Sequence, residues 1–327
     1  MAAELPPNLK AAIAAKLEGV SRNALAERAA HLSATYRDGD GSATGIRDTA
    51  DGLAYLVTRL PATYAAAGAV FAAFRDAAPD FIPRSLLDVG AGPGTASFAA
   101  VQEWPGIAAA TMIELNRAFA HLAGDLTANA HPALAGGMRI LADATRFGRD
   151  LPRANLVVAA YTLAEIAPAA LAPLVASLWQ ATEGALVLVE PGTPAGFQRI
   201  RAARAALIAE GAGIAAPCPH AETCPIVEPD WCHFAIRLSR SRDHRLAKGA
   251  DAPYEDEKFS YVVAVRPTVA VVPFAARVLA PPYVTKAEMR LKLCTSEGAI
   301  AERVVRRRDS AAYARVRRLW WGDPLGA

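Results

Sequence analysis

Along this chain, the spacing of apolar positions changes near residue 80. Apolar side chains recur every three or four residues through the Ala-rich segments 9–32 and 51–74, and this spacing predicts helices across residues 9–78. The stretch 37–45, RDGDGSATG, lies between them and predicts a loop, because glycine and aspartate favour turns. Residues 1–78 are therefore expected to form an N-terminal helical region.

From Ser85 onward, short apolar runs alternate with helix-like segments. The runs are SLLDVG, AAATMIEL, MRILADA, NLVVAAYTL and GALVLVEPG. Short buried strands that alternate with helices are typical of a doubly wound parallel sheet. The pattern therefore predicts an α/β core over residues 79–212.

The last third of the chain, residues 213–327, follows a predicted helix over 195–211. It opens with a cysteine-rich stretch and continues with one more predicted strand, FSYVVAVRP. The acids of the preceding YEDEK predict either a solvated turn or contacts that order nearby basic residues. From Ala276 the alternation predicts two or three antiparallel strands, closed by a short basic helix ending in WWGD. We expect a small β-rich, cysteine-containing part here.

Composition and the opening segment indicate where the protein is located. Hydrophobic residues make up 53% of the 327 residues, yet no run reaches the roughly 20 apolar residues of a membrane span, so no membrane contact is expected. The opening segment carries Glu4 and shows neither an apolar core with a cleavage site nor an Arg-rich presequence. These features predict a bacterial cytoplasmic location, with an organellar matrix less favoured. Reduced cysteines in such a compartment favour a metal or cluster over disulfides.

The net charge of +3 is unevenly distributed. Residues 1–200 hold 15 Lys/Arg against 18 Asp/Glu, and residues 201–327 hold 20 against 14. One basic cluster comprises Arg237, Arg240, Arg242, Arg245 and Lys248. A second comprises Arg303, Arg306, Arg307, Arg308, Arg315, Arg317 and Arg318, interleaved with Tyr313, Trp320 and Trp321. Arginines among aromatic residues suit a phosphate backbone with stacked bases, so RNA is the favoured partner over a merely solvated charged surface.

The segment LLDVGAGPGTASF is the most specific local signal. A predicted strand ends at Asp88 and Val89, and Gly90, Gly92 and Gly94 follow before a helix. Glycines at such a turn let the backbone double back and approach a ligand closely. The ligand could be a dinucleotide or S-adenosylmethionine, but a dinucleotide fold prefers the spacing G-x-G-x-x-G.

The G-x-G-x-G spacing, with an acid two residues before it, resembles motif I of class I methyltransferases. In that motif the acid, here Asp88, faces the cationic methionine part of S-adenosylmethionine. Glu114, at the end of the next strand, fits the carboxylate that accepts the ribose hydroxyls. Asp143, after the third strand, fits the acid near the adenine amine. Three carboxylates at successive strand ends would meet at the same edge of the sheet, which favours S-adenosylmethionine binding.

The end of the fourth predicted strand carries a weaker signal for methyl transfer. Amino-directed base methyltransferases of this class have Asn/Asp-Pro-Pro-aromatic at this point, whereas this chain reads AAYTLAEI. Tyr161 could stack on a base and Glu165 could act as a base, although packing and helix-start roles are commoner for these residue types. A cytosine C5 mechanism needs a cysteine here, and none is present. The sequence predicts methyl-donor binding more strongly than transfer and assigns no catalytic residue.

The cysteines follow an unusual spacing. Cys218, Cys224 and Cys232 are spaced C-x5-C-x7-C, and Cys294 follows downstream. Zinc sites usually contain closer C-x2-4-C pairs, whereas wide gaps and four thiolates suit a [4Fe–4S] cluster. His220 and His233 leave zinc with three cysteines and one histidine as the alternative. A [4Fe–4S] cluster bound by the four cysteines is favoured, and its expected role is structural.

Several segments together resemble a known family. They are RLPATYAA, LLDVGAGPGT, LVEPGTPAGF, CPHAETCP, DWCHF, YEDEKFSYVVAVR and a terminal WGD. From about Tyr55 onward the chain is similar to the methyltransferase-like family of mitochondrial small-ribosomal-subunit assembly factors and their bacterial relatives. The resemblance implies a Rossmann-like class I methyltransferase core, association with small-subunit rRNA, and a [4Fe–4S] site on the four cysteines.

Three functional hypotheses follow. The first is an rRNA methyltransferase that uses S-adenosylmethionine during assembly of the small ribosomal subunit. The second is a non-catalytic, RNA-binding assembly factor that retains the fold. The third is a zinc-stabilised methyltransferase of small molecules, which would leave both basic clusters without a role.

Overall fold

Five parallel strands form most of the main sheet, from segments in which most positions are apolar, and β3 is its exposed edge. The computed structural model describes residues 4–37 and 41–326, so residues 38–40 of the expected loop lie outside the described residues. Parallel strands buried on both faces require such continuous apolar runs. The strands are β1 Ser85–Val89, β2 Ala109–Glu114, β3 Met138–Leu141, β4 Ala154–Ala160 and β5 Thr182–Pro191.

The order of the strands defines the fold. The sheet runs β3-β2-β1-β4-β5-β8-β6, with β6 Gly213–Ala216 and β8 Tyr254–Val265, and β8 is antiparallel to both of its neighbours. A further strand, β7 Phe234–Ser239, pairs with the first half of β8. This arrangement is a Rossmann-like class I methyltransferase core, and the predicted fold class is confirmed.

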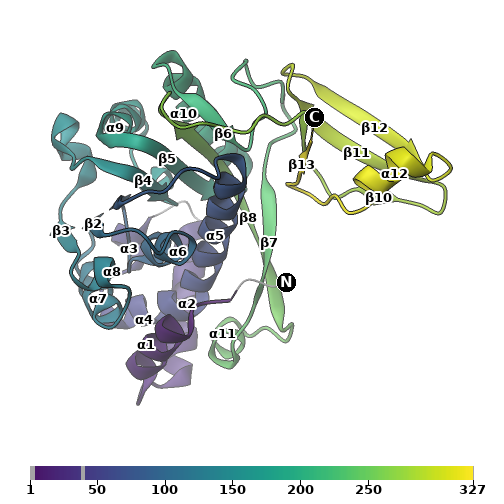
Figure 1. Ribbon diagram of the computed structural model, residues 1–327. Helices are drawn as coiled ribbons and strands as arrows, with labels where there is room; N and C mark the ends of the chain where they lie inside the picture. The colour runs from purple at the N-terminus through teal and green to yellow at the C-terminus, as the bar shows by residue number, and fades with distance from the viewer. Residues whose placement is uncertain (1–3, 38–40, 327) are drawn as a thin grey trace.

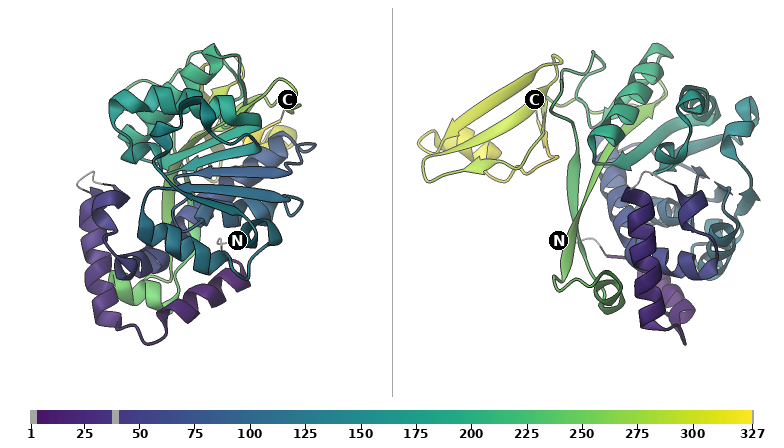
Figure 2. Two further views of the ribbon diagram at one scale, coloured as in Figure 1. Left: turned by 90° about the vertical axis from the view of Figure 1, so that its left-hand side faces the viewer. Right: turned by 180° about the vertical axis from the view of Figure 1, so that it is seen from behind.

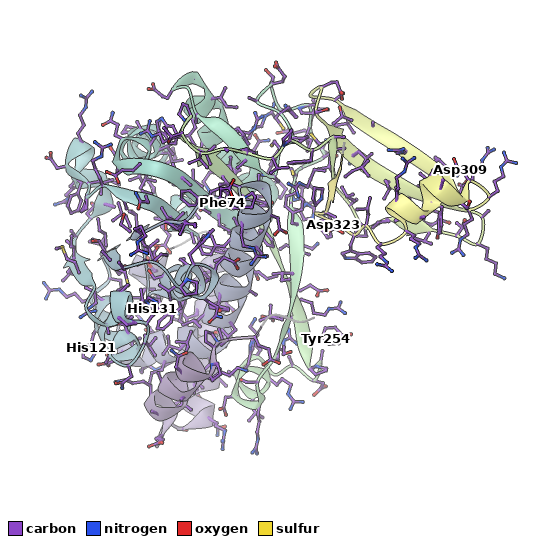
Figure 3. All side chains as sticks on the ribbon, in the orientation of Figure 1. Phe74, His121, His131, Tyr254, Asp309 and Asp323 are labelled. Carbon is purple, nitrogen blue, oxygen red and sulfur yellow. The ribbon has the colours of Figure 1, made fainter. Side chains whose placement is uncertain are left out.

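Helices cover both faces of this sheet (Figures 1 and 2). One apolar cluster joins α5, α6 and α7 to one face, and a second joins α9 and α10 to the other. Phe74 lies in the first of these clusters (Figure 3). These helices are α5 Leu60–Ala77, α6 Thr95–Glu103, α7 Arg117–Thr127, α9 Pro168–Ala181 and α10 Pro194–Ala209. Shorter elements between the strands are α8 Pro132–Ala135, η1 Ala144–Arg146, η2 Gly148–Asp150 and η3 Leu163–Glu165.

The N-terminal segment is helical, as its spacing predicts. Its remaining elements are α1 Pro7–Leu17, α2 Arg22–Arg37, α3 Ser42–Gly45 and α4 Thr49–Thr58. The buried carboxylate of Asp51 joins them, because it accepts hydrogen bonds from Arg28 at 2.7 Å and Arg47 at 2.8 Å. Burial alone would raise the pKa of Asp51, but the two guanidinium groups lower it to about 2. The single turn of α3 lies where the sequence predicts a loop.

The β7–β8 ribbon corrects the interpretation of YEDEK as a solvated turn. The strand begins at Tyr254 rather than Phe259, because β7 pairs with it residue by residue from Ser239 to Phe234. The helix α11 Arg242–Lys248 connects the two strands and packs against α2 and α4. The ribbon therefore links the C-terminal third to the N-terminal helices (Figure 1).

A small antiparallel sheet projects from the side of the core (Figure 2). Its elements are β9 Ala276–Val278, β10 Tyr283–Val284, β11 Glu288–Thr295, β12 Ile300–Arg306, β13 Pro324–Leu325 and the helix α12 Ser310–Val316. We call these elements together the small sheet. The predicted antiparallel strands and basic helix are thus present, with five strands rather than two or three. Val278, Leu291, Val305 and Val316 belong to its own core, and Asp309 marks its outer end (Figure 3).

Among the residues that the structure describes, no single helix is long and apolar enough to cross a membrane. The helices α4 and α5 meet the length and composition criteria only as a pair, which is bent by 52°.

Candidate functional site

The glycine loop after β1 has the backbone that its sequence predicts. Gly90, Gly92 and Gly94 all lie in the left-handed region, with φ of 68°, 56° and 86°. A Cβ atom at Gly90 would come within 2.4 Å of Thr162 Oγ1. Because other residues rarely adopt this conformation, glycine is required for this turn. The turn lies at the carboxyl end of β1, where doubly wound sheets bind their ligands.

Asp88 lies beneath this loop. Its Oδ2 accepts hydrogen bonds from the backbone N–H of Ser97 at 3.0 Å and from Ser97 Oγ at 2.7 Å, and its side chain is buried. Burial raises the pKa of Asp88 to about 6, although the bonds from Ser97 act in the opposite direction. Asp88 therefore ties the first turn of α6 to β1, while its predicted contact with the methionine part stays a prediction.

Glu114 and Asp143 follow β2 and β3. Glu114 Oε2 accepts from Gly92 N at 2.7 Å and Oε1 accepts from Asn116 N at 2.7 Å, and burial raises its pKa. Asp143 Oδ1 accepts from Thr145 Oγ1 at 2.6 Å, and this bond lowers its pKa. The structure thus joins Glu114 to the glycine loop, whereas Asp143 caps the short helix η1.

The turn α3 spans the ends of β2 and β4. Ser42 donates from its backbone N–H and its hydroxyl to the Glu165 carboxylate, at 2.9 and 2.6 Å. Asn116, after β2, donates from Nδ2 to Ile46 O at 2.8 Å. Because β1 lies between β2 and β4, these bonds place α3 over the glycine-loop side of the sheet. Glu165 is thereby used to hold the turn, and burial raises its pKa.

Tyr161 directly follows β4 and has a left-handed backbone, with φ of 60°. Its backbone N–H donates to Val189 O at 2.7 Å, and its hydroxyl donates to Glu257 Oε1 on β8 at 2.9 Å. A non-glycine residue in this conformation is strained and persists only where its surroundings hold it. Burial raises the pKa of Tyr161 well above its usual value. The phenol that could stack on a base is therefore tied to β8.

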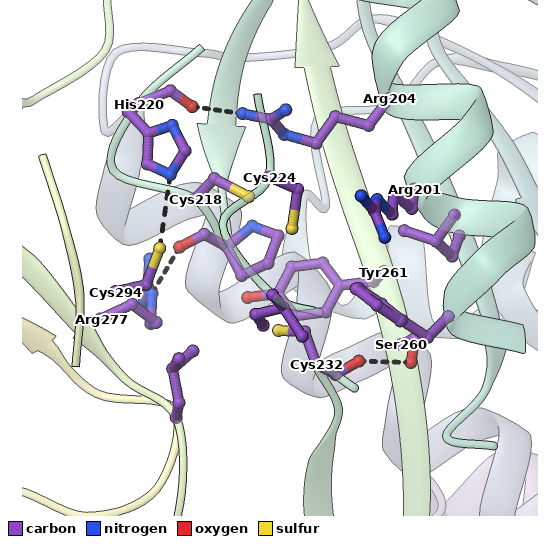
Figure 4. Close-up of a pocket in the computed structure, with 15 residues that line it drawn as sticks. Arg201, Arg204, Cys218, His220, Cys224, Cys232, Ser260, Tyr261, Arg277 and Cys294 are labelled. Atoms are coloured by element: carbon purple, nitrogen blue, oxygen red, sulfur yellow. Dashed lines mark hydrogen bonds between the residues drawn. The ribbon is translucent and has the colours of Figure 1, made fainter. Parts of the chain in front are cut away.

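The four cysteines line one cavity of about 30 Å³ (Figure 4). Cys218, Cys224 and Cys232 come from the loop between β6 and β7, and Cys294 comes from β11 of the small sheet. All four are free thiols. The cavity therefore lies where the core and the small sheet meet.

The two histidines of the zinc alternative differ in position. His220 lines the cavity, and its Nε2 lies 3.3 Å from Cys294 Sγ. His233 instead stacks on Trp231, with ring centroids 5.0 Å apart, and its edge contacts Trp321. Within the described part of the chain, no group of three or more His, Cys, Asp or Glu is arranged to hold a metal ion. The cysteines therefore stay a predicted ligand set.

Burial is the largest influence on the pKa values of three thiols in this cavity. It raises the pKa of Cys294 to about 12, and it raises the pKa values of Cys218 and Cys232, with the neighbouring cysteines adding to the effect. The nearby guanidinium groups of Arg204 and Arg277 act in the opposite direction. Since a thiol must lose its proton to bind a metal, burial opposes metal binding at Cys218, Cys232 and Cys294, and a cationic metal centre would have to offset this effect.

The first basic cluster is partly neutralised inside the fold. Arg237 donates to both oxygens of Asp256, at 2.8 and 2.9 Å. Arg240 and Lys248 each donate to Glu255 at 2.8 Å. The acids of YEDEK therefore pair with three of the five cations that the sequence suggested for RNA.

The second basic cluster is different. Its seven arginines lie on β12, on the turn after it, on α12 and directly after α12, and all seven are exposed. Within residues 4–37 and 41–326, none has an acidic side chain within ion-pair distance. We call them the arginine surface: Arg303, Arg306, Arg307, Arg308, Arg315, Arg317 and Arg318. Arg307 stacks over the Tyr313 ring at 5.2 Å, and Trp320 is 61% exposed nearby in sequence.

Comparison with family models identifies the chain. The model described as mitochondrial small ribosomal subunit Rsm22 matches residues 49–326. The chain belongs to this family. The Rsm22 match covers the core, the cysteine loop and the small sheet, and it confirms the family resemblance drawn from the sequence motifs.

Two curated relatives show how far the similarity extends. The human ribosome assembly protein METTL17, mitochondrial, is 28% identical over 84% of this chain and 62% of that protein. The Rsm22-cox11 tandem protein 2, mitochondrial, of Schizosaccharomyces pombe is 25% identical over 94% of this chain and 47% of that protein. This Rsm22-family chain therefore spans roughly half to three fifths of the length of these relatives.

Solved methyltransferase structures overlap with part of the chain. Magnesium protoporphyrin IX methyltransferase from Synechocystis PCC 6803, with bound SAM, is 14% identical with a TM-score of 0.39, covering 63% of this chain and 80% of that one. An O-methyltransferase family protein from Burkholderia thailandensis is 10% identical with a TM-score of 0.43, covering 68% and 61%. The assignment of the fold rests on the strand order and helix layers described above.

The predicted bacterial cytoplasmic location is wrong. The Rsm22 family description and the relatives from human and fission yeast are all mitochondrial, which points to an organelle. The prediction used only the residue types of the opening segment. Those residues precede the region 49–326 that the family model matches.

Sequence reasoning missed several residues of these sites. Thr162, Ser42 and Asn116 surround the glycine loop, and Arg204 and Arg277 line the cysteine cavity. Asn116 directly follows the MIEL strand, so its position could have indicated it. The other four reach their sites only through tertiary packing.

Proposed function

We propose that this protein assists assembly of the small ribosomal subunit by binding its rRNA through the arginine surface. The proposal depends on the seven exposed arginines, which have no acidic partner among residues 4–37 and 41–326, in a chain of the Rsm22 family. Unpaired guanidinium groups bind phosphates without first breaking an ion pair. The exposed Trp320 and the half-buried Tyr313 offer rings for unstacked bases.

S-adenosylmethionine is the proposed ligand of the glycine loop. Glu114 supports this because its carboxylate accepts from backbone N–H groups of the loop and of the strand end, yet a carboxylate has about four acceptor sites, so it can also accept from a ribose hydroxyl. Gly92 brings the loop backbone against the same carboxylate. Asp143 remains the proposed partner of the adenine amine. When bound, this cofactor supplies a transferable methyl group.

The four cysteines fit a [4Fe–4S] cluster by donor type and number. All are free thiols, all line one cavity, and none is consumed by a disulfide. Four thiolates are the usual ligands of such a cluster. Cys294 alone comes from the small sheet, so the cluster would hold the arginine surface in place against the core. Zinc with His220 in place of one cysteine is the alternative for the same cavity.

The residues that follow β4 favour a non-catalytic role over methyl transfer. The two candidate groups are both committed to structural bonds, Tyr161 to Glu257 and Glu165 to Ser42. The chain also lacks the Asn/Asp-Pro-Pro-aromatic segment of amino-directed base methyltransferases. A methyltransferase of small molecules would leave the arginine surface without a role.

Binding of small-subunit rRNA fragments, measured by fluorescence anisotropy at fixed salt, tests the proposal. The variant Arg306→Ala, Arg307→Ala, Arg308→Ala removes three charges of the arginine surface. The matched control Arg84→Ala, Arg149→Ala, Arg237→Ala removes three exposed charges elsewhere. We expect the first variant to lose at least tenfold in affinity and the control to stay within threefold of the native protein. Equal losses in both would mean that only net charge matters and would refute the proposed surface.

A further inference from the structure

Two arginines are buried beside the four cysteines. Arg204 extends from α10 and is 5% exposed, and Arg277 extends from β9 of the small sheet and is 3% exposed. Both line the cavity that the cysteines line (Figure 4). One guanidinium group therefore comes from the core and the other from the small sheet, and both lie at the cavity where these two parts meet.

Neither arginine is neutralised by a carboxylate. Arg204 donates to Glu222 O at 2.9 Å and to His220 O at 2.7 Å. Arg277 donates to Pro217 O at 2.8 Å and to Gly322 O at 2.8 Å. Within the described residues, neither guanidinium has an acidic side chain within ion-pair distance. The Nε atom of Arg204 is also buried without a hydrogen-bond partner.

A buried charge is costly unless an opposite charge faces it. Carbonyl oxygens satisfy the N–H groups but bring no negative charge. The groups in the same cavity that can become anionic are the four thiols and the Tyr261 phenol. Thiols become thiolates when they bind a metal centre, and a cluster with four thiolate ligands is net anionic. The charge of the two arginines is thus balanced once the cysteines are ligands.

We infer that Arg204 and Arg277 are the counter-charges of an anionic four-thiolate centre. This inference rests on the proposed [4Fe–4S] site. The two residues act as positioning residues, because their bonds to Pro217, His220 and Glu222 also fix the loop that carries Cys218. Since the net charge around a cluster contributes to its potential, these cations favour the reduced, more negative form.

The test compares variants that keep or remove the charge. Arg204→Lys and Arg277→Lys keep it, and Arg204→Gln and Arg277→Gln remove it. The matched control is Arg266→Gln, since Arg266 likewise donates to two backbone carbonyl oxygens, those of Thr182 and Trp179, but does not line the cavity. Full-length protein is purified without oxygen. Iron and sulfide are quantified, and the midpoint potential is measured by titration with dithionite.

The expected result is a midpoint more negative in both Gln variants, or loss of iron and sulfide from them, while both Lys variants and the Arg266→Gln control resemble the native protein. Gln and Lys variants that behave alike would overturn the inference, because the hydrogen bonds rather than the charge would then matter. Gln variants with the native iron content and midpoint would overturn it as well. A native protein without iron or sulfide would instead refute the proposed cluster itself.

Discussion

The backbone N–H of Gly92 donates to Oε2 of Glu114 over 2.7 Å, so the end of β2 holds the middle of the glycine loop. The other carboxylate oxygen accepts from Asn116 N at 2.7 Å, and Asn116 in turn bonds the segment after α3 through Ile46 O. One side chain thus couples the loop, the strand end and the N-terminal segment. Its carboxylate is also the group proposed to receive a ribose.

Glu114→Gln tests this role. Gln keeps one acceptor oxygen but loses the charge, so charge-assisted hydrogen bonds to the ribose are weakened. We expect S-adenosylmethionine affinity to fall about 10- to 100-fold, the equivalent of roughly 1.5–3 kcal/mol. Isothermal titration calorimetry measures it, with the exposed Glu183→Gln as control. An unchanged dissociation constant would remove Glu114 from the proposed cofactor site.

Asp88 predicts a pH dependence of stability. Burial raises its pKa to about 6 in the folded protein, against about 3.9 in an unfolded chain. The folded state therefore binds this proton more tightly. The stability that the group contributes is fully present below the unfolded pKa, and it is lost as the pH rises through the folded pKa.

Asp88→Asn removes this titration while keeping an oxygen that can accept from Ser97. Compared with the native protein, we expect the variant to gain roughly 2–3 kcal/mol more at pH 7.5 than at pH 4. Urea unfolding at the two pH values measures the difference. The same gap between variant and native protein at both pH values would contradict the raised pKa.

Local sequence rules were sufficient for the main sheet and the glycine loop. Alternating apolar runs depend on short-range spacing, and Gly90, Gly92 and Gly94 adopt the turn that only glycine tolerates. The orientation of the Asp88 side chain could not be predicted from local sequence rules. Its carboxylate bonds Ser97 because the first turn of α6 folds back over β1, which is a tertiary event.

The charged segments show the same limit. Arg237 and Arg306 look alike in sequence, yet Arg237 is paired with Asp256 and Arg306 has no acidic partner in the part of the chain that the structure describes. The difference arises because Asp256 pairs with Arg237 directly across the β7–β8 ribbon, whereas Glu288, which lies opposite Arg306 on β11, pairs with Arg290 instead. Arg204 and Arg277 likewise carry no local signal, since burial beside the cysteines requires α10 and β9 to meet.

Salt dependence gives an independent test of the arginine surface. If the seven arginines each contact a phosphate of single-stranded RNA, the slope of log K against log salt should be about −5. Arg306→Ala, Arg307→Ala, Arg308→Ala should reduce its magnitude by about 2. Affinities measured over a series of KCl concentrations provide the slopes. A native slope near zero would exclude a backbone-driven RNA interface.

The cysteine ligands are tested by single substitutions. Cys224→Ser should lower iron and sulfide together and reduce solubility, because the cluster would then lack one of four thiolates at the junction of core and small sheet. His220→Asn should keep both elements, since a [4Fe–4S] centre uses only the cysteines. Elemental analysis of anaerobically purified protein distinguishes the cluster from the zinc site. Zinc at one per chain, lost in His220→Asn, would instead support the three-cysteine, one-histidine site.

Ultraviolet cross-linking of the protein to small-subunit rRNA, followed by mass spectrometry of the linked peptides, identifies the surface that contacts RNA. We expect cross-links in peptides of β12, α12 and the segment containing Trp320, and their loss in the variant Arg306→Ala, Arg307→Ala, Arg308→Ala. Cross-links confined to the β7–β8 ribbon or to the helices of the core would contradict the assignment of RNA binding to the arginine surface.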